Sequence, residues 1–198
     1  MNISILENKA DTLNARVGAI TFFVAAFMTL LLSHFSEPLA PLRLLTLAVA
    51  AFAAWAFCDE MGLKAPLNRG GFVFFAIAIA TKIQIVLGLT EQFIGRYYLL
   101  YSAFLLLAVL FWSVAFLHRQ RTLKIIGVVG VFASLIPIIV IILGHLVIGI
   151  GTFFGADALL SATSGETLID LGFVTTIERT FGLWAYVAGW LLWKGHIK

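Results

Sequence analysis

Three ionisable side chains stand inside long apolar stretches of this sequence: Lys82, Glu178 and Arg179. A charged group near the centre of a lipid bilayer costs at least ~2.5–3.5 kcal/mol on insertion scales, so it needs a partner or a water-filled cavity. Lys82 and Glu178 have opposite charges, and their places in the chain give them a similar depth. We therefore predict an ion pair between them, because an unpaired buried charge costs more than a paired one. Arg179 is expected either to join this pair or to reach the outer interface.

These charges belong to a wider set of polar residues that could bind a ligand or line an ion pathway. The candidates are Lys82, Gln84, His145, Glu178 and Arg179. An enzyme would use the same residue types as acid–base and anion-binding groups. Three interpretations stay open: a structural ion pair that locks the helices, a ligand or ion site, and long side chains that reach the membrane interface.

Two histidines could ligate a metal or a haem iron, since a neutral imidazole nitrogen is a common ligand for both. His34 and His145 are expected at similar depth near the outer membrane face. Nothing in the sequence shows that their helices face each other, so no cofactor is predicted and haem stays an alternative. The single cysteine, Cys58, excludes an intramolecular disulfide and a CxxC redox or thiolate-metal motif.

The elements that must position these residues are apolar helices. Of the 198 residues, 62% are hydrophobic and 12% charged, whereas about 25% of the residues of a soluble domain are charged. A spanning helix needs about 20 mostly apolar residues. Six stretches qualify: about 16–35, 41–58, 71–90, 97–117, 124–149 and 172–193. We predict one all-α membrane domain over residues 1–198, a bundle of six transmembrane helices, with short connectors such as residues 64–71 and a longer outer loop over residues 150–171.

Basic residues indicate the orientation, because cytoplasmic loops collect Lys and Arg. One side of the predicted topology carries nine of them and the other side two, which places both termini in the cytoplasm. Aromatic residues prefer the two membrane interfaces. They agree with this orientation, since the cytoplasmic ends hold Trp55, Trp112, Trp190 and Trp193, and the opposite face holds Tyr97, Tyr98 and Tyr101. The sequence thus predicts a multi-pass cell-membrane protein of a bacterial inner membrane.

Two of the predicted helices carry polar stripes. On the last helix, small and polar side chains lie on one side and bulky apolar ones on the other, which is typical of a helix that turns its polar side to the bundle interior. This polar side consists of Thr175, Glu178, Arg179, Gly182, Tyr186 and Gly189. The third helix has a shorter stripe, which includes Thr81 and Gln84. Pro137 lies within the fifth stretch, where its missing backbone donor predicts a kink.

No catalytic motif of the zinc peptidases, serine hydrolases, lipid-phosphate enzymes or P-loop nucleotidases occurs in the sequence. We therefore favour a non-enzymatic membrane protein that binds or passes a small solute or ion, or that acts as a subunit of a larger membrane complex. The alternatives are a membrane-embedded enzyme for a lipid or quinone-like substrate and a haem-bearing electron-transfer subunit. The expected partners are membrane lipid and either a second copy or other membrane subunits, and no basic run with interleaved aromatics predicts a nucleic-acid partner.

Overall fold

The computed structural model describes residues 3–31, 39–58, 65–89, 94–118, 121–153 and 171–195. Within these ranges the chain forms six α-helices and no strand. They are α1 (Ile3–Leu31), α2 (Leu39–Cys58), α3 (Ala65–Val86), α4 (Ile94–Leu117), α5 (Arg121–Phe153) and α7 (Leu171–Gly195). The prediction of an all-α protein is confirmed for the described part of the chain.

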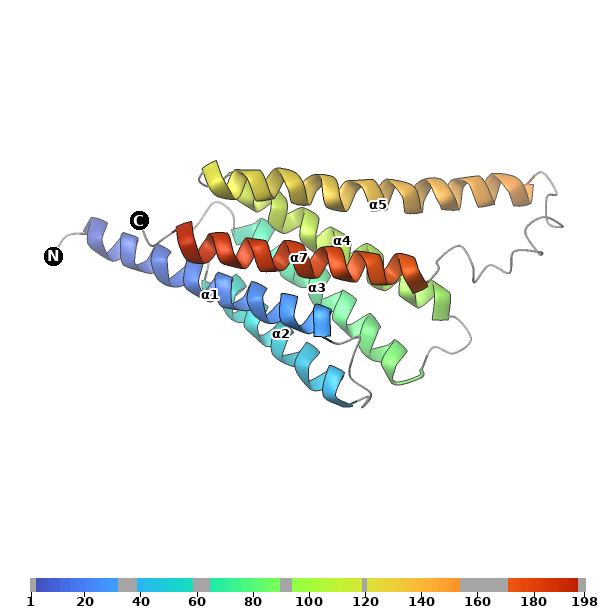
Figure 1. Cartoon of the computed structure of the whole chain (residues 1–198), viewed down its shortest axis with the longest axis horizontal. Coiled ribbons are helices and arrows are strands. Elements are labelled where there is room, and N and C mark those ends of the chain that lie inside the picture. The colour runs from blue at the N-terminus through green and yellow to red at the C-terminus, as the bar shows by residue number, and fades with distance from the viewer. Residues whose placement is uncertain are drawn as a thin grey trace.

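Successive helices run in alternating directions, so the start of α1 and the end of α7 lie at the same end of the bundle (Figure 1). We call this end the terminal end and the opposite one the far end. α1 packs against α2 and α7, α2 against α3, α3 against α4, and α4 against α5. α7 also contacts α4 and α5. The helices therefore close into a ring in which α7 joins α1 to the α4–α5 side.

Large apolar side chains are exposed on all six helices, from Phe27 on α1 to Leu183 on α7. A water-soluble monomer rarely exposes contiguous apolar surface on this scale. Three helices contain stretches long and apolar enough to cross a membrane, and these are Leu13–Leu30, Pro66–Val86 and Tyr97–Leu117. Shorter apolar stretches lie at Leu45–Ala56 and Leu123–Ile139. The helices fit a transmembrane protein whose exposed faces contact lipid.

Aromatic rings fill the core of the bundle on its terminal side. Phe22 of α1 makes edge-on contacts with Phe52, Trp112 and Trp184, at ring-centroid distances of 5.2, 5.3 and 5.5 Å. Phe52 also stacks on Trp112 at 4.5 Å. Each such ring pair contributes about 0.5–1.5 kcal/mol beyond the burial of its surface. The core therefore obtains its stability from apolar packing and needs few polar contacts.

Two tryptophans expected at a membrane interface lie in this core instead. Trp55 and Trp112 are only 4% and 0% exposed, so the prediction that they anchor the helix ends in the interface is wrong. An indole has a large apolar body, which suits a packed core as well as an interface. Trp190 and Trp193 differ from them, because both remain exposed near the end of α7.

A glycine on a neighbouring helix makes room for each of the three core tryptophans. The pairs are Gly18 with Trp55, Gly71 with Trp112 and Gly130 with Trp184. A β-carbon on Gly18 would lie 2.7 Å from the indole nitrogen of Trp55, a distance too short for any side chain there. Each pair joins two helices that follow each other in the described chain: α1 with α2, α3 with α4, and α5 with α7. The same kind of close contact between a glycine and an indole thus recurs at three helix interfaces of the bundle.

All six helices begin before the predicted spans, and α1 and α3 do so by the largest margins. α1 starts at Ile3, so the polar residues ahead of its apolar stretch are helical too. α3 starts at Ala65 and takes in residues that were expected to form a connector. Pro66 fits there because proline is tolerated in the first turn of a helix. Gly70 and Gly71 stay helical because rings of α4 occupy the space beside them. The expected outer loop over residues 150–171 lies mostly outside the described residues.

α5 continues through Pro137 as one helix. Figure 1 shows it as a long, nearly straight rod that reaches past the start of α7 at the far end, without the sharp kink that the sequence predicts. Proline leaves the carbonyl of Ala133 without its helical donor. The first half of α5 is held against α4 and α7, where Ser134 donates a hydrogen bond to the carbonyl of Gly130 at 2.8 Å. These neighbours keep the helix straight at the cost of one backbone hydrogen bond.

Only part of the polar stripe of α7 faces the bundle interior, so the sequence prediction is correct for Glu178 and wrong for Arg179 and Tyr186. The buried side of α7 is the bulky apolar one, formed by Val174, Ile177, Phe181, Trp184, Ala185, Ala188 and Leu192. Arg179 and Tyr186 are exposed, whereas Gly182 and Gly189 bring α7 close to α1. The small residues of the stripe therefore serve close helix packing, and two of its four polar residues turn outward, whereas Thr175 and Glu178 are partly buried.

Candidate functional site

The ion pair that the sequence predicts is present in the structure. Nζ of Lys82, on α3, lies 2.8 Å from Oε1 of Glu178 on α7. At this distance the ion pair is also a charge-assisted hydrogen bond. The two side chains are 20% and 17% exposed. The pair is therefore largely shielded by protein, although neither side chain is fully buried.

Two tyrosine rings of α4 flank the ammonium group of Lys82. Nζ lies 4.9 Å from the ring centroid of Tyr101 and 5.3 Å from that of Tyr98. Both distances are within the range of about 6 Å over which an aromatic face attracts a cation. Tyr101 is buried, and its hydroxyl is close enough to the carboxylate of Glu178 for the two groups to interact electrostatically. One carboxylate and two aromatic rings thus surround a single positive charge.

Three helices position this cluster at the far end of the bundle. Lys82 lies four residues before α3 ends at Val86. Tyr98 and Tyr101 belong to the first two turns of α4, and Glu178 belongs to the first two turns of α7. α3 and α4 are neighbours in sequence and pack side by side. Glu178 comes from a helix much later in the chain, so the cluster forms only when the ring of helices closes.

Glu178 differs from the other acidic residues of the chain in that the structure describes its side chain. Arg179 follows it directly but is exposed and lies outside the Lys82–Glu178 pair. Gln84 is exposed as well, two residues after Lys82. Of the four predicted site residues whose side chains the structure describes, it therefore brings together two, Lys82 and Glu178.

The histidine hypothesis falls on residues that the structure does not fully describe. His34 lies outside the described residues, and His145 belongs to α5 but its side chain is not described. Ligation of haem or a metal by these residues stays a prediction. Among the described residues, no group of three or more His, Cys, Asp or Glu side chains could hold a metal ion.

Tyr98 and Tyr101 are site residues that the sequence pointed to only as interface aromatics. Their spacing of three residues puts both rings on one face of a helix. That spacing, at the start of the helix after the one that holds Lys82, is the signal that points to a shared role, although it suits interface aromatics equally well. Ser102 is the next residue along α4, and its buried Oγ has no hydrogen-bond partner among the described residues.

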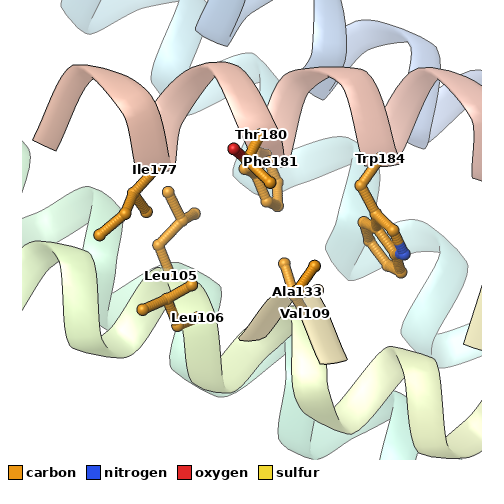
Figure 2. Close-up of a pocket in the computed structure, with 8 residues that line it drawn as sticks. All are labelled: Leu105, Leu106, Val109, Ala133, Ile177, Thr180, Phe181 and Trp184. Carbon is orange, nitrogen blue, oxygen red and sulfur yellow. The ribbon is translucent and has the colours of Figure 1, made fainter. Parts of the chain in front are cut away.

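The interior next to the cluster is apolar and tightly packed. α4, α5 and α7 enclose a cavity of about 10 Å³, and Figure 2 shows side chains from all three helices around it. Its walls are Leu105, Leu106, Val109, Ala133, Ile177, Thr180, Phe181 and Trp184. A single water needs about this volume and two or more polar partners. The hydroxyl of Thr180 already donates to the carbonyl of Thr176 at 2.8 Å and can only accept a further hydrogen bond, so this cavity offers a solute no space and little polar contact.

Comparison with protein-family models, curated proteins and solved structures finds no match for this chain. Any function has to follow from the chemistry of the cluster itself. A carboxylate beside two aromatic faces is an arrangement that recognises a cation. In this structure the ammonium of Lys82 occupies that position.

Proposed function

We propose that this chain is a multi-pass membrane protein that binds a small organic cation at Glu178, Tyr98 and Tyr101. The observation that carries the proposal is the position of Lys82 Nζ, 2.8 Å from Glu178 and 4.9 and 5.3 Å from the centres of two tyrosine rings. Lysine is a tethered ammonium ion, so it marks where the ammonium group of a solute sits. The incoming cation displaces Lys82 and takes over its contacts.

When a solute displaces it, the ammonium group of Lys82 can move towards water at the end of α3. The end of α3 at Val86 is four residues away, which is about 6 Å at 1.5 Å per residue. A lysine side chain is long and flexible enough to carry its charge that far towards water. The exchange keeps one positive charge beside Glu178 at all times, so no buried carboxylate is left unpaired.

A binding site is favoured over a central pathway because the core has little free space. Phe22, Phe52, Trp112 and Trp184 fill the terminal side of the bundle, and the cavity between α4, α5 and α7 measures about 10 Å³. A solute that binds at the far end does not have to pass these rings. An enzyme built from Lys82, His145, Glu178 and Arg179 is supported less well, because Arg179 is exposed and outside the cluster.

We further infer that all six helices span the cell membrane and that the terminal end faces the cytoplasm. The alternating helix directions and the exposed apolar side chains on every helix support this topology. Four exposed cations belong to helix segments at the terminal end: Arg16, Arg69, Lys124 and Lys194. Arg43 and Arg179 are the exposed cations described nearer the far end. Basic residues favour the cytoplasmic side of a membrane protein, which agrees with this orientation.

Binding of ethylammonium to the detergent-solubilised protein, measured by titration calorimetry, tests the proposed site. Replacing Lys82 with Met removes the internal competitor, so Lys82→Met should bind ethylammonium about tenfold more tightly than the wild type, equivalent to about 1.4 kcal/mol. Glu178→Gln should abolish binding. Lys124→Met removes an exposed cation from α5 and should bind like the wild type. Equal affinity in Lys82→Met and the wild type, or binding that survives in Glu178→Gln, would refute the proposal.

The topology is tested separately with single cysteines in a Cys58→Ser background. We expect a membrane-impermeant maleimide to label Arg43→Cys in intact cells. Lys194→Cys should react only after the cells are permeabilised. The opposite pattern would invert the orientation, and labelling of both sites in intact cells would show that the helices between them do not cross the membrane as proposed.

A further inference from the structure

An apolar groove of about 720 Å³ runs along the outer face of α1. It shares no residue with the cation site. Its walls come from α1, from Leu47 of α2 and from Tyr186 of α7. Phe23 and Tyr186 meet in it at a ring-centroid distance of 5.6 Å, and Phe27 is 61% exposed. The walls are apolar apart from the tyrosine hydroxyl. The groove therefore suits a hydrocarbon chain.

Two cations lie beyond the terminal end of this groove, one on α1 and one on α7. We call the line along which α1 and α7 meet here the seam. Arg16 precedes Phe23 by seven residues, and Lys194 follows Tyr186 by eight. With a rise of 1.5 Å per residue, both charges lie about 10–12 Å further along their helices than the Phe23–Tyr186 contact. At about 100° per residue, Arg16 lies on nearly the same face of α1 as Phe23, and Lys194 is turned by about 80° from Tyr186 on α7, so Arg16 continues the line of the groove and Lys194 flanks it.

Each of these cations rests on an exposed indole. The guanidinium of Arg16 lies 5.9 Å from the ring centroid of Trp193, and Nζ of Lys194 lies 4.2 Å from that of Trp190. Both indoles are about two-fifths exposed, at 42% and 43%. Exposed tryptophans at the end of a membrane helix mark the level of the lipid headgroups. The ring contacts hold both charges at this level and leave their outer sides free.

We infer that this seam binds one molecule of an anionic phospholipid from the leaflet at the terminal end. One acyl chain lies in the groove over α1, and the phosphate accepts hydrogen bonds from Arg16 and Lys194. The order of the features fits the order of the groups in the lipid, because the positive charge lies at one end and the apolar groove follows it towards the middle of the bundle. The groove reaches from Phe23 to Leu30, about 10 Å of helix, which is within one leaflet of a hydrocarbon core about 30 Å thick.

The charge at the end of the groove favours a lipid over a second copy of the chain. A second copy would bring its own Arg16 and Lys194 to the same seam, and like charges side by side repel. Basic residues between membrane helices on the cytoplasmic side are a known means of recognising anionic headgroups, each worth about 1 kcal/mol near the surface. The inference goes beyond the cation site and shares with it only the membrane location.

Native mass spectrometry of the full-length protein in detergent tests this inference by counting bound lipids. The probes are dioleoyl phosphatidylglycerol, which is anionic, and dioleoyl phosphatidylcholine, which is neutral overall. The wild type should retain one phosphatidylglycerol tightly and no phosphatidylcholine. Arg16→Gln and Lys194→Gln should each weaken that binding about fivefold. Lys124→Gln, which removes an exposed cation from α5 at the same end of the bundle, should bind like the wild type.

A groove variant separates binding of the chain from binding of the headgroup. Leu47→Trp fills the groove from α2 and should weaken binding of dioleoyl phosphatidylglycerol, although every cation is present. The inference is overturned if Lys124→Gln weakens binding as much as Lys194→Gln, because binding would then depend on the total positive charge at this end of the bundle and not on a specific site. It is also overturned if Leu47→Trp binds the lipid like the wild type. A dimer of the wild type that Leu47→Trp converts to a monomer would assign the groove to a second copy and contradict the inference.

Discussion

The terminal side of the bundle and its far end are stabilised in different ways. On the terminal side, rings from several helices meet around Phe22, and none of them depends on one particular partner. At the far end, Lys82 has one acidic partner, and the tyrosines of α4 complete its surroundings. Apolar packing is shared over many contacts, whereas an ion pair in a membrane depends on two residues. The far end therefore relies on one polar contact between two residues, and the ring cluster holds the helices together through many apolar ones.

Removing a ring from the terminal side should have the largest effect on stability. Trp112 is fully buried and touches Phe22, Phe52 and Phe75. Trp112→Ala leaves a large cavity that this core cannot fill, so we expect a loss of about 3–5 kcal/mol in the free energy of unfolding. Denaturant titration in detergent micelles measures it. Trp193→Ala is the control, because this indole is exposed, and it should cost less than about 1 kcal/mol.

Breaking the ion pair at the far end should have the next largest effect. Glu178→Gln leaves the ammonium of Lys82 without its countercharge, and we expect a loss of about 1–3 kcal/mol, reduced from the value for a fully buried pair because both side chains are partly exposed. Arg179→Gln alters the adjacent exposed charge and should stay within about 0.5 kcal/mol of the wild type. Equal losses in the two variants would mean that Arg179 contributes to the cluster after all.

Replacing each site tyrosine with phenylalanine should have the smallest effect on the free energy of unfolding. The two variants should differ from each other. Tyr101 is buried with its hydroxyl near Glu178, so Tyr101→Phe should cost about 0.5–1.5 kcal/mol, the usual value of one hydrogen bond. Tyr98→Phe keeps the ring that faces Lys82 and should be nearly neutral. The same denaturant titration compares them. If Tyr98→Phe costs more than Tyr101→Phe, the hydroxyl contact with Glu178 has been assigned to the wrong ring.

Much of the helical arrangement could be predicted from the sequence, because a chain with so few charged residues has to bury or embed its apolar stretches. The pairing of Lys82 with Glu178 could be predicted for a related reason, since neither charge is stable alone in an apolar setting. The site's two tyrosines could not be assigned, because a tyrosine near a helix end suits both a lipid interface and a cation site.

Other features depend on tertiary packing that the sequence does not display. Trp55 and Trp112 have the composition of interface anchors, yet glycines on neighbouring helices admit them to the core. Residues 65–71 contain proline and two glycines, which locally favour a connector. The rings of α4 pack against those glycines and keep the segment helical. The sequence predicts that the polar stripe of α7 faces inward. Aromatic and aliphatic side chains fill the interior instead, and Arg179 and Tyr186 of the stripe are exposed.

Exchange of the two charges tests most directly whether Lys82 and Glu178 depend on each other. Lys82→Glu and Glu178→Lys each place two like charges at the contact, and both single variants should unfold at clearly lower temperatures than the wild type. The double variant Lys82→Glu with Glu178→Lys restores opposite charges across α3 and α7, and its melting temperature in detergent should recover most of that loss. A double variant no more stable than the worse single variant would contradict the pairing of these residues and the closure of the helix ring that brings them together.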